Sequence, residues 1–441
     1  MNIVPGRYRL NTVELSSGLY GNDGRIDVIS GIIGEVNIFE NIFSDSITGN
    51  VVVSDSENLP STFPIVGHEK ILIDMVNPDI EEDTNEGHIK SEYKIYSITQ
   101  QSKDAEGVIS YLLNFQSEEI FTNLKSSVSK AYSGSTISNY VRAIYDEYID
   151  SDKVIDIEPT KNNYNFVIPN WKPFKTINWM AQRAIGEDKN GANYLFFENR
   201  NGFVFASLEK FYEGDIKENY YYERVASEDV MGIGLPDGNR FITNYKINTS
   251  FNILENIPIG MYASRLVVHD ITKRQVYNVD YNYSKRFDTY ENVESWGGGK
   301  ISWEDVLDVS VHDSQETNTL VHDTIDEYTT SPKSFQRIIT KHSALHDGLE
   351  NDYMERTVQN RISQMEQLNN FILEFFVPGD FRRNIGDVIY INIPSIEVVS
   401  QEDKLYSGRY IIIALRHRID GERHSMIVVA AKDSYFTPIP A

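Results

Sequence analysis

Phe63-Pro-Ile-Val-Gly67-His-Glu-Lys-Ile-Leu-Ile73 and Phe381-Arg-Arg-Asn-Ile-Gly386-Asp-Val-Ile-Tyr-Ile391 are the two stretches that decide the fold, because they match each other in order. About 25 residues after each stretch comes a strand led by tyrosine, Tyr93-Lys-Ile-Tyr-Ser-Ile98 or Tyr410-Ile-Ile-Ile-Ala-Leu415. A glycine-containing turn and an apolar strand with a polar end then close each copy. The order predicts a duplicated β-unit, although any two antiparallel β-domains share some of these features.

The rest of the first segment favours strands without intervening helices. Apolar and polar residues alternate over short runs, as in a half-buried sheet. Strands of this kind without helices between them suggest a barrel or a sandwich. They are expected at residues 35–39, 49–54, 67–75, 93–98 and 108–115.

The middle of the chain, residues 121–212, reads as an α/β unit. Ser135 is a candidate N-cap for a first helix, and Pro173 fits the first turn of a second. Asn201-Gly202 lies between two apolar runs, which is a strong hairpin signal.

Strands resume over residues 240–283, and a polar stretch follows at 288–332 with Trp296-Gly-Gly-Gly-Lys300 as a break. A helix is expected from Phe335, pausing near Gly348 and continuing to about Leu368. The last segment is again rich in strands.

We therefore predict an α+β chain, mostly β, with two similar antiparallel β-barrel domains, an inserted α/β domain and a polar and helical insertion. The first barrel is placed at residues 1–119 and the α/β domain at 120–235. The second barrel combines 236–285 with 369–441, and the polar and helical insertion is 286–368.

The composition and charge of the chain exclude several classes of function. The 441 residues include 41 basic and 65 acidic side chains, which gives a net charge of −24. Such a surface repels nucleic acid and anionic membranes. The absence of cysteine excludes disulfides, thiolate catalysis and sulfur-based zinc sites. The first residues lack the apolar core of a signal peptide, so we expect a cytoplasmic product that is not exported by a cleaved signal.

Histidine clusters are the first candidates for chemistry. His342, His346 and Glu350 have the i, i+4, i+8 spacing of one helical face, which could hold a divalent metal. The catalytic glutamate beside the first histidine of a zinc protease is missing, so a solvated helix face is favoured. Three His-Asp dipeptides are expected at the surface, since neighbours on a strand face opposite ways. They are His269-Asp270, His312-Asp313 and His322-Asp323.

An acidic stretch weakly resembles a calcium-binding loop. Glu81, Asp83, Asn85 and Glu92 fall at ligand positions, but Glu86 stands where the turn requires glycine. A solvated acidic loop is the favoured interpretation. Neither a Gly-x-Ser-x-Gly elbow nor a phosphate-binding Gly-x-x-x-x-Gly-Lys loop is present. No pair among the many carboxylates stands out as catalytic. We predict no catalytic, cofactor-binding or metal-binding residues.

Many weak signals in one order resemble the baseplate hub proteins of contractile phage tails, which are related to the hub part of type VI secretion spikes. The segments that carry the resemblance are Phe39-Glu-Asn-Ile-Phe-Ser-Asp-Ser-Ile-Thr-Gly-Asn-Val-Val-Val-Ser-Asp-Ser56, Leu59-Pro, Phe63-Pro-Ile-Val-Gly67, Val167-Ile-Pro-Asn170, Met180-Ala-Gln-Arg-Ala184, Tyr194-Leu-Phe-Phe-Glu198, Tyr262-Ala-Ser-Arg-Leu266, Val377-Pro-Gly-Asp380 and Gly386-Asp387. They cover residues 35–285 and 350–437, and the polar region 288–332 has no recognised counterpart.

The resemblance implies a non-enzymatic homotrimer whose two barrels per chain form a pseudo-sixfold ring. The implied partners are the central spike, a tail tube or tube-initiator protein and baseplate wedge proteins, in a virion assembled in the host cytoplasm. Genomic DNA would pass through without specific binding, and no membrane would be bound. Possible interface strands are 51–53, 71–73, 93–98, 389–393 and 410–415. A hub-associated peptidoglycan hydrolase and a sugar-binding tail adhesin are the alternatives.

Overall fold

The computed structural model describes residues 5–18, 24–56, 59–79, 87–103, 108–187, 191–222, 238–249, 252–271, 274–283, 291–293, 336–341, 352–395, 403, 405–421 and 423–434.

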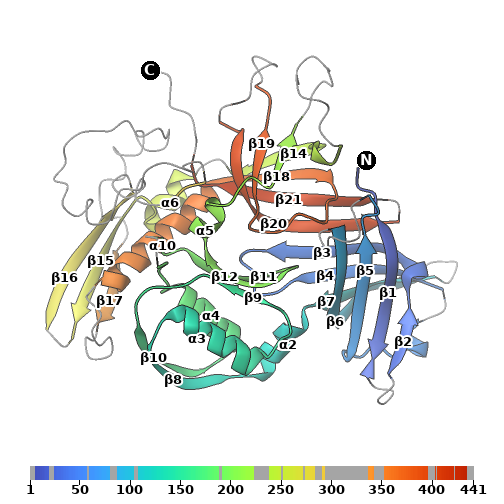
Figure 1. Cartoon of the computed structure of the whole chain (residues 1–441), viewed down its shortest axis with the longest axis horizontal. Helices are drawn as coiled ribbons and strands as arrows, with labels where there is room; N and C mark the ends of the chain where they lie inside the picture. The colour runs from blue at the N-terminus through green and yellow to red at the C-terminus, as the bar shows by residue number, and fades with distance from the viewer. Residues whose placement is uncertain are drawn as a thin grey trace.

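Thirteen of the described strands form one large sheet (Figure 1). Its main path runs β14-β18-β21-β20-β3-β4-β7-β6-β5-β1-β2, and β19 joins β13 to β20 beside that path. The strands are β1 Arg9–Ser17, β2 Arg25–Val28, β3 Ile33–Asn41, β4 Thr48–Asp55, β5 Glu69–Val76, β6 His88–Lys103, β7 Ile109–Gln116, β13 Glu218–Tyr221, β14 Asn244–Thr249, β18 Phe371–Pro378, β19 Val388–Asn392, β20 Gly408–Asp420 and β21 His424–Lys432.

The N-terminal strands, which the sequence predicted, pack around a core of their own. In β4 the alternating residues Val51 and Val53 are fully buried, as a one-sided sheet requires. They share a core with Ile71, Tyr93 and Phe115. The C-terminal strands surround a second core, to which β18, β19, β20 and β21 all contribute.

The two β-units repeat each other in register. Strands β4, β5, β6 and β7 pair in the order β4-β7-β6-β5, and β18, β19, β20 and β21 pair in the order β18-β21-β20-β19. Tyr93 lies opposite Ile71, as Tyr410 lies opposite Ile389. A bulge interrupts β6 between Ile95 and Ser97 and interrupts β20 between Ile412 and Ala414, at the same distance from these tyrosines.

The glycines of the repeat have the same role. Gly67 and Gly386 precede β5 and β19 with φ of 99° and 88°. Residues other than glycine rarely adopt such a positive φ, which explains why glycine stands at this point of both copies. The predicted fold class, mostly β with a repeated antiparallel unit and α/β insertions, is confirmed, and the two β-units share one continuous sheet.

The inserted α/β unit lies beside the first β-unit (Figure 1). Its aromatic core contains Phe174, Phe196, Phe203 and Tyr194. Its elements are α2 Glu118–Lys125, β8 Val128–Ser135, α3 Ile137–Ile144, the π-helix Tyr145–Ile149, β9 Ile155–Ile157, β10 Tyr164–Trp171, α4 Pro173–Ala181, β11 Tyr194–Asn199, β12 Gly202–Ser207 and α5 Leu208–Tyr212.

Two local predictions shift by one residue. Thr136, rather than Ser135, is the N-cap of α3, because Ser135 ends β8 and the Thr136 side chain accepts from the Asn139 amide. The hairpin loop is Arg200 and Asn201, since Asn199 pairs with Gly202. Pro173 begins α4 as predicted.

A small sheet and a long helix stand at the other side of the molecule. Strand β15 Ala263–Asp270 lies between β16 Gln275–Asn282 and β17 Gln336–Lys341, with α6 Ile253–Ile259 before them and α10 Asp352–Asn370 against the sheet. The prediction of helix from Phe335 is wrong for residues 336–341. There the β-branched Ile338 and Ile339 pair in parallel with β15 instead.

Short elements complete the described chain: the 3-10 helices Ser30–Ile32 and Gly238–Arg240, and α1 Leu59–Thr62. Of the polar stretch 288–332, only 291–293 are described, so the Trp296-Gly-Gly-Gly-Lys300 break lies outside the described residues.

Candidate functional site

The joint between the two β-units is a strand pair. Strand β3 of the first unit lies antiparallel to the second half of β20, with Asn41 opposite Ala414 and Glu35 opposite Asp420 (Figure 1). The first half of the same edge of β20 is occupied by β19, from Gly408 to Ile411. The joint is therefore made by main-chain pairing and continues the sheet from one unit into the other.

Ion pairs cover the exposed side of this joint. Arg418 Nη2 lies 2.9 Å from Glu35 Oε2, and Arg416 Nη2 lies 3.5 Å from Glu35 Oε1. Arg416 Nε also donates to Asn37 Oδ1 at 3.0 Å. These cations lower the pKa of Glu35, although its partial burial opposes them. Exposed pairs of this kind add at most about 1 kcal/mol each.

The buried side of the joint holds the Glu40 cluster, which we define as Glu40, Arg200, His417 and His424. Glu40 is 1% exposed, and its Oε1 lies 3.3 Å from Arg200 Nε and 3.5 Å from His417 Nε2. His417 Nδ1 in turn lies 3.0 Å from His424 Nε2. Arg200 comes from the β11–β12 turn, so this cluster links the inserted unit to both β-units.

Burial sets the charge states in the cluster. It raises the pKa of Glu40 to about 7, although Arg200 opposes this shift. Burial lowers the pKa of His417 and of His424 well below the usual value, and the nearby Arg200 acts in the same direction. Both histidines are therefore neutral at pH 7. Neither carboxylate oxygen of Glu40 has a hydrogen-bond donor in the described part of the chain.

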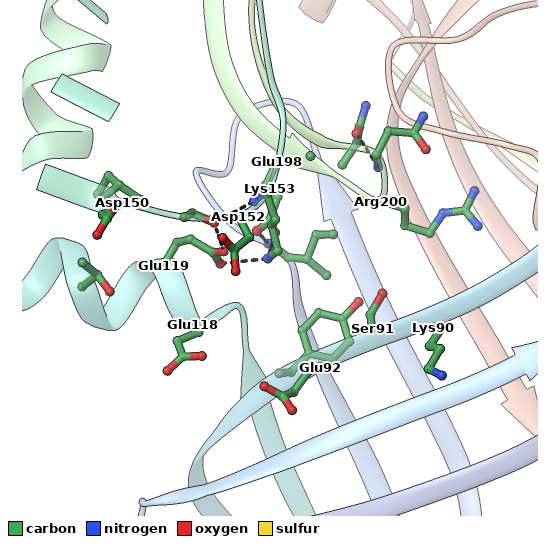
Figure 2. Close-up of a pocket in the computed structure, with 18 residues that line it drawn as sticks. Lys90, Ser91, Glu92, Glu118, Glu119, Asp150, Asp152, Lys153, Glu198 and Arg200 are labelled. Atoms are coloured by element: carbon green, nitrogen blue, oxygen red, sulfur yellow. Dashed lines mark hydrogen bonds and ion pairs between the residues drawn. The ribbon is translucent and has the colours of Figure 1, made fainter. Parts of the chain in front are cut away.

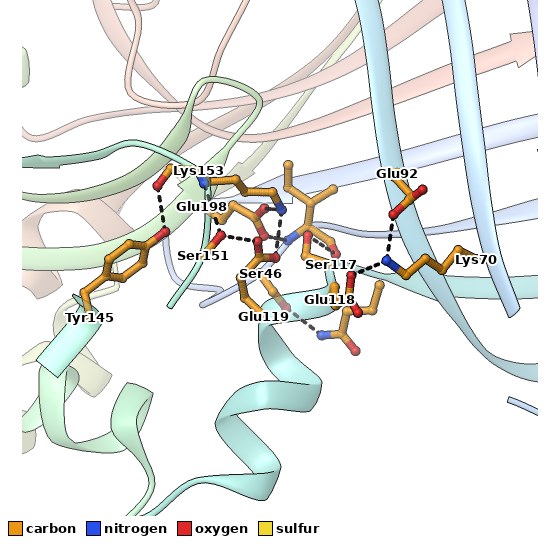
Figure 3. A network of polar contacts seen from close by, with 12 residues as sticks. Ser46, Lys70, Glu92, Ser117, Glu118, Glu119, Tyr145, Ser151, Lys153 and Glu198 are labelled. Atoms are coloured by element: carbon orange, nitrogen blue, oxygen red, sulfur yellow. Dashed lines mark hydrogen bonds and ion pairs between the residues drawn. The ribbon is translucent and has the colours of Figure 1, made fainter. Parts of the chain in front are cut away.

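A second cluster, the Lys153 cluster, joins the inserted unit to the first β-unit (Figures 2 and 3). Lys153 Nζ donates to Glu119 Oε2 at 2.8 Å and to Glu198 Oε1 at 2.6 Å. The other oxygens are also used, because Ser151 donates to Glu119 and the Ile47 amide donates to Glu198.

This carboxylate pair has the composition of a glycosidase site, with two carboxylates whose pKa values differ in direction. Burial raises the pKa of Glu198, whereas Lys153 lowers that of Glu119 against burial. A retaining hydrolase, however, needs two carboxyl groups facing a sugar between them. Here an ammonium group occupies that position, and Glu198 is only 1% exposed. The geometry is that of a structural tie between units.

Several strands of this sheet have an open edge among the described strands, namely β14, β2, β13 and part of β6. Strand β14 ends the strand order on one side and pairs only with β18 among the described strands. In β6, residues 88–94 pair with β5 on one edge and residues 94–103 pair with β7 on the other, so the second half of β6 has an open edge among the described strands. Tyr96 is 52% exposed on this second half of β6.

Most of the predicted interface strands have no edge to offer. Residues 51–53 lie between β3 and β7, residues 71–73 between β1 and β6, and residues 389–391 of β19 between β13 and β20. In 410–415, Ile411, Ala414 and Leu415 are already paired on both edges within the chain. Only 93–98 includes a half-paired strand segment. Paired edges cannot accept a further strand, so sequence patterning overestimated the available interface.

Most of the candidate metal residues lie outside the described part of the chain. No group of three or more metal-ligating side chains occurs among the residues that the structure describes. His269 is exposed on β15, and Glu92 binds Lys70 at 2.8 Å. The other candidates lie outside the described residues: His342, His346, Glu350, His312-Asp313, His322-Asp323, Glu81, Asp83, Asn85 and Glu86.

Neither polar cluster could be predicted from the sequence. Glu40, Arg200 and His417 are far apart in the chain and carry no motif spacing. The one available signal was a polar residue next to an apolar run: Glu40 directly follows the predicted strand 35–39, and His417 lies two residues after the predicted strand 410–415.

The fold is that of phage and prophage tail proteins. The tail protein from Neisseria meningitidis MC58 superimposes with a TM-score of 0.54 at 11% identity, covering 98% of each chain. The 43 kDa tail protein of prophage MuSo2 from Shewanella oneidensis gives 0.52 at 10% identity, covering 97% of this chain and 100% of that one.

A sequence relative makes the comparison more specific. The chain is 22% identical over 419 residues to the probable baseplate hub protein gp334 of Vibrio phage KVP40, covering 91% of this chain and 90% of the relative. The resemblance to baseplate hub proteins is thereby confirmed. No protein-family model matches the chain. In the described part of the chain, no helix has both the length and the apolar character that crossing a membrane requires.

Proposed function

We propose that this protein is a structural, non-enzymatic baseplate hub subunit that assembles as a ring of three chains and six similar β-units. One observation carries the proposal: the two β-units of a chain are already joined edge to edge by β3 and β20, and the equivalent edges, on β14 and on the second half of β6, have no partner among the described strands.

The equivalence follows from the strand order and the registers of the repeat. Strands β3-β4-β7-β6 of the first unit correspond to β14-β18-β21-β20 of the second. Hence β14 is the counterpart of β3, and β6 is the counterpart of β20. Within a chain, β3 pairs with the second half of β20. The matching contact between chains joins β14 of one copy to the second half of β6 in the next.

This contact satisfies both edges at once. Exposed strand edges promote association, and an antiparallel strand added from another chain is a common way to cover them. Because each chain supplies one β14 edge and one β6 edge, the contact is head-to-tail and can close into a ring. Closure after three chains turns two joined units into six, which agrees with the assembly that the resemblance implies.

The inter-chain contact differs from the intra-chain joint in charge. By the registers, Ser102 stands where the joint has Arg418, and Lys246 stands where it has Asn37. Thr99 and Asn244 replace Arg416 and Glu35 in the same way. The contact between chains therefore depends on main-chain pairing and apolar packing, and it should be less sensitive to salt.

The finer roles follow from the same proposal. Such a ring would connect a threefold central spike with a sixfold tail tube or tube initiator and with baseplate wedge proteins. It would reside in the virion baseplate after assembly in the host cytoplasm, with DNA passing through it unbound. The domain limits 1–119, 120–235, 236–285 with 369–441, and 286–368 belong to this proposal. Its support is the hub-named relative, the duplicated unit and the unmatched edges.

The contact can be tested by engineered disulfides, because the chain has no cysteine of its own. In the intra-chain joint Asn37 lies opposite Arg418, and the equivalent pair between chains is Lys246 with Ser102. The side chains of Lys246 and Ser102 are both exposed, so substituting them should leave the fold intact. Residues directly opposite in antiparallel strands have Cα atoms about 4.5 to 5.5 Å apart, within the range of a disulfide.

The variant combining Ser102→Cys with Lys246→Cys should form inter-chain disulfides on mild oxidation and give covalent dimers and trimers on a non-reducing gel. The pair Asn37→Cys with Arg418→Cys should cross-link within one chain and serves as a positive control. A mismatched pair, Ser102→Cys with Lys125→Cys, should remain monomeric on the gel. Equal cross-linking by the matched and mismatched pairs, or none by the matched pair, would contradict the proposed contact.

A further inference from the structure

A cavity of about 860 Å³ lies where three parts of the chain meet: the start of β6, the β11–β12 turn and the loop before β19. Five lysine or arginine side chains line it, against one carboxylate, Asp387. The five cations are Lys90, Arg200, Lys217, Arg382 and Arg383. In a chain with 65 acidic and 41 basic residues, this is a local reversal of charge.

The three arginines of this basic cavity differ in how far they are already neutralised. Arg382 holds Asp380 with two contacts, at 2.9 Å from Nε and 2.7 Å from Nη2. Arg200 faces Glu40 at 3.3 Å and donates to Asn384 Oδ1. These two guanidinium groups have partners of their own.

Arg383 is different. Its side chain is only 7% exposed, yet its nearest carboxylate oxygens are 3.8 Å away in Asp380 and 4.0 Å away in Asp387. Neither Nε nor Nη1 of Arg383 has a hydrogen-bond acceptor in the described part of the chain. Buried donors without acceptors destabilise a fold unless a ligand or another group satisfies them.

A second cavity of about 530 Å³ adjoins the basic cavity and shares Lys90, Ser91, Arg200 and Asn201 with it. Six carboxylates line this second cavity: Glu92, Glu118, Glu119, Asp150, Asp152 and Glu198. Figure 2 shows Glu118, Glu119 and Asp152 on one side of this space and Lys90 and Arg200 on the other. The charges are therefore separated, and an anionic ligand would be confined to the basic cavity.

We propose that the basic cavity binds a segment of a partner protein that is rich in aspartate and glutamate. Guanidinium groups bind carboxylates strongly, as Arg382 already does with Asp380. Ser91, Asn201 and Asn384 add hydroxyl and amide groups that can bond a peptide main chain. The volume lies within the roughly 300 to 1,000 Å³ of usual ligand sites.

The same cavity is poorly suited to nucleic acid. Single-stranded nucleic acid is bound by stacking its bases on exposed aromatic rings. Phe381 in the cavity lining is 2% exposed and is already stacked on His424 with a centroid distance of 4.3 Å. The ring of His88, which also lines the cavity, is held by Asp74 at 3.0 Å. The net charge of −24 also disfavours a long polyanion, whereas a short acidic segment experiences mainly the local cations.

This inference goes beyond the ring, because it assigns a ligand to a cavity within one chain. It is tested on the full-length protein with a fluorescently labelled oligoglutamate peptide, followed by anisotropy at low salt. The variant Lys90→Glu with Lys217→Glu changes two exposed side chains of the basic cavity. The matched control, Lys125→Glu with Lys175→Glu, makes the same change of charge at exposed residues outside both cavities.

We expect the wild-type protein to bind oligoglutamate and not oligoglutamine of the same length. Binding should weaken by about tenfold or more in the Lys90 and Lys217 variant and by less than about twofold in the control. Arg383→Gln should also weaken binding of oligoglutamate. An unchanged melting temperature or circular dichroism spectrum shows that this variant is folded. No binding by the wild-type protein, an equal loss in the control, or tighter binding of oligothymidylate than of oligoglutamate would overturn the proposal.

Discussion

Replacing Glu40 by glutamine should change how the free energy of unfolding depends on pH. Burial raises the pKa of Glu40 from 4.5 to about 7 in the folded state. The folded protein therefore holds this proton more tightly than the unfolded chain does. The resulting stabilisation is fully present below pH 4.5 and is lost as the pH rises through 7.

The magnitude follows from the size of the shift. A difference of about 2.5 pKa units corresponds to about 3 kcal/mol over the whole range, at 1.36 kcal/mol per unit. Measurements below about pH 5.5 would approach the isoelectric point of 4.8, where solubility is lowest. Between pH 5.5 and pH 8 the same linkage amounts to about 2 kcal/mol. Glu40→Gln lacks this titration, so its stability relative to the wild-type protein should rise by that amount from pH 5.5 to pH 8.

The comparison isolates Glu40 from its neighbours. The attraction between Arg200 and ionised Glu40 is already contained in the pKa of about 7 and needs no separate correction. His417 and His424 act in the opposite sense, because their lowered pKa values give a stabilisation that is lost as pH falls below 6.5, but both proteins share this contribution. Urea unfolding at fixed protein concentration, followed by intrinsic fluorescence, measures the effect.

A surface control should show almost no pH dependence in this window. Lys130 lowers the pKa of the exposed Glu147 below its usual 4.5, so Glu147 is ionised in both states from pH 5.5 to pH 8 and the stability difference between Glu147→Gln and wild type should stay nearly constant. A stability difference between Glu40→Gln and wild type that stays constant with pH, or falls as pH rises, would refute the assignment of a buried and largely desolvated Glu40.

Two further substitutions test the packing and the tie between units. Gly49→Ala would place a Cβ atom 2.2 Å from the Phe115 ring and 2.4 Å from the Asn37 carbonyl oxygen, so it should lower the free energy of unfolding by about 1 to 3 kcal/mol in chemical unfolding. Gly31→Ala has no neighbour within 4 Å of the new Cβ atom and should lower it by less than about 1 kcal/mol. Equal losses would contradict close packing at Gly49. Lys153→Met leaves Glu119 and Glu198 without their shared cation and should lower the free energy of unfolding by about 3 kcal/mol. Lys210→Met, whose partner Asp156 is exposed, should lower it by less than about 1 kcal/mol. Similar losses would show that the Lys153 cluster is no stronger than a surface pair.

The repeated β-unit could be predicted from sequence because its signals are local. A glycine before a strand, a leading tyrosine and alternating residues each reflect a short-range backbone requirement. Gly67 and Gly386 both have a positive φ in the structure. The inserted α/β unit could be predicted for the same reason, from Pro173 in the first turn of a helix and Gly202 in the hairpin.

What depends on long-range pairing could not be predicted. Residues 336–341 carry a helix-like pattern, yet they pair with β15, about 70 residues earlier in the chain. The edge of β20 is covered by β3, nearly 400 residues away, so no local pattern shows that this predicted interface strand is already occupied. Glu40, Arg200 and His417 meet only because that pairing forms.

The central claim is that the chain closes into a ring through β14 and β6. The molar mass in solution, measured by light scattering coupled to size exclusion at moderate salt, tests it most directly. Three copies of a 50.6 kDa chain predict a species of about 152 kDa that persists on dilution into the low micromolar range. A single species of 50.6 kDa, even in concentrated samples, would contradict the account.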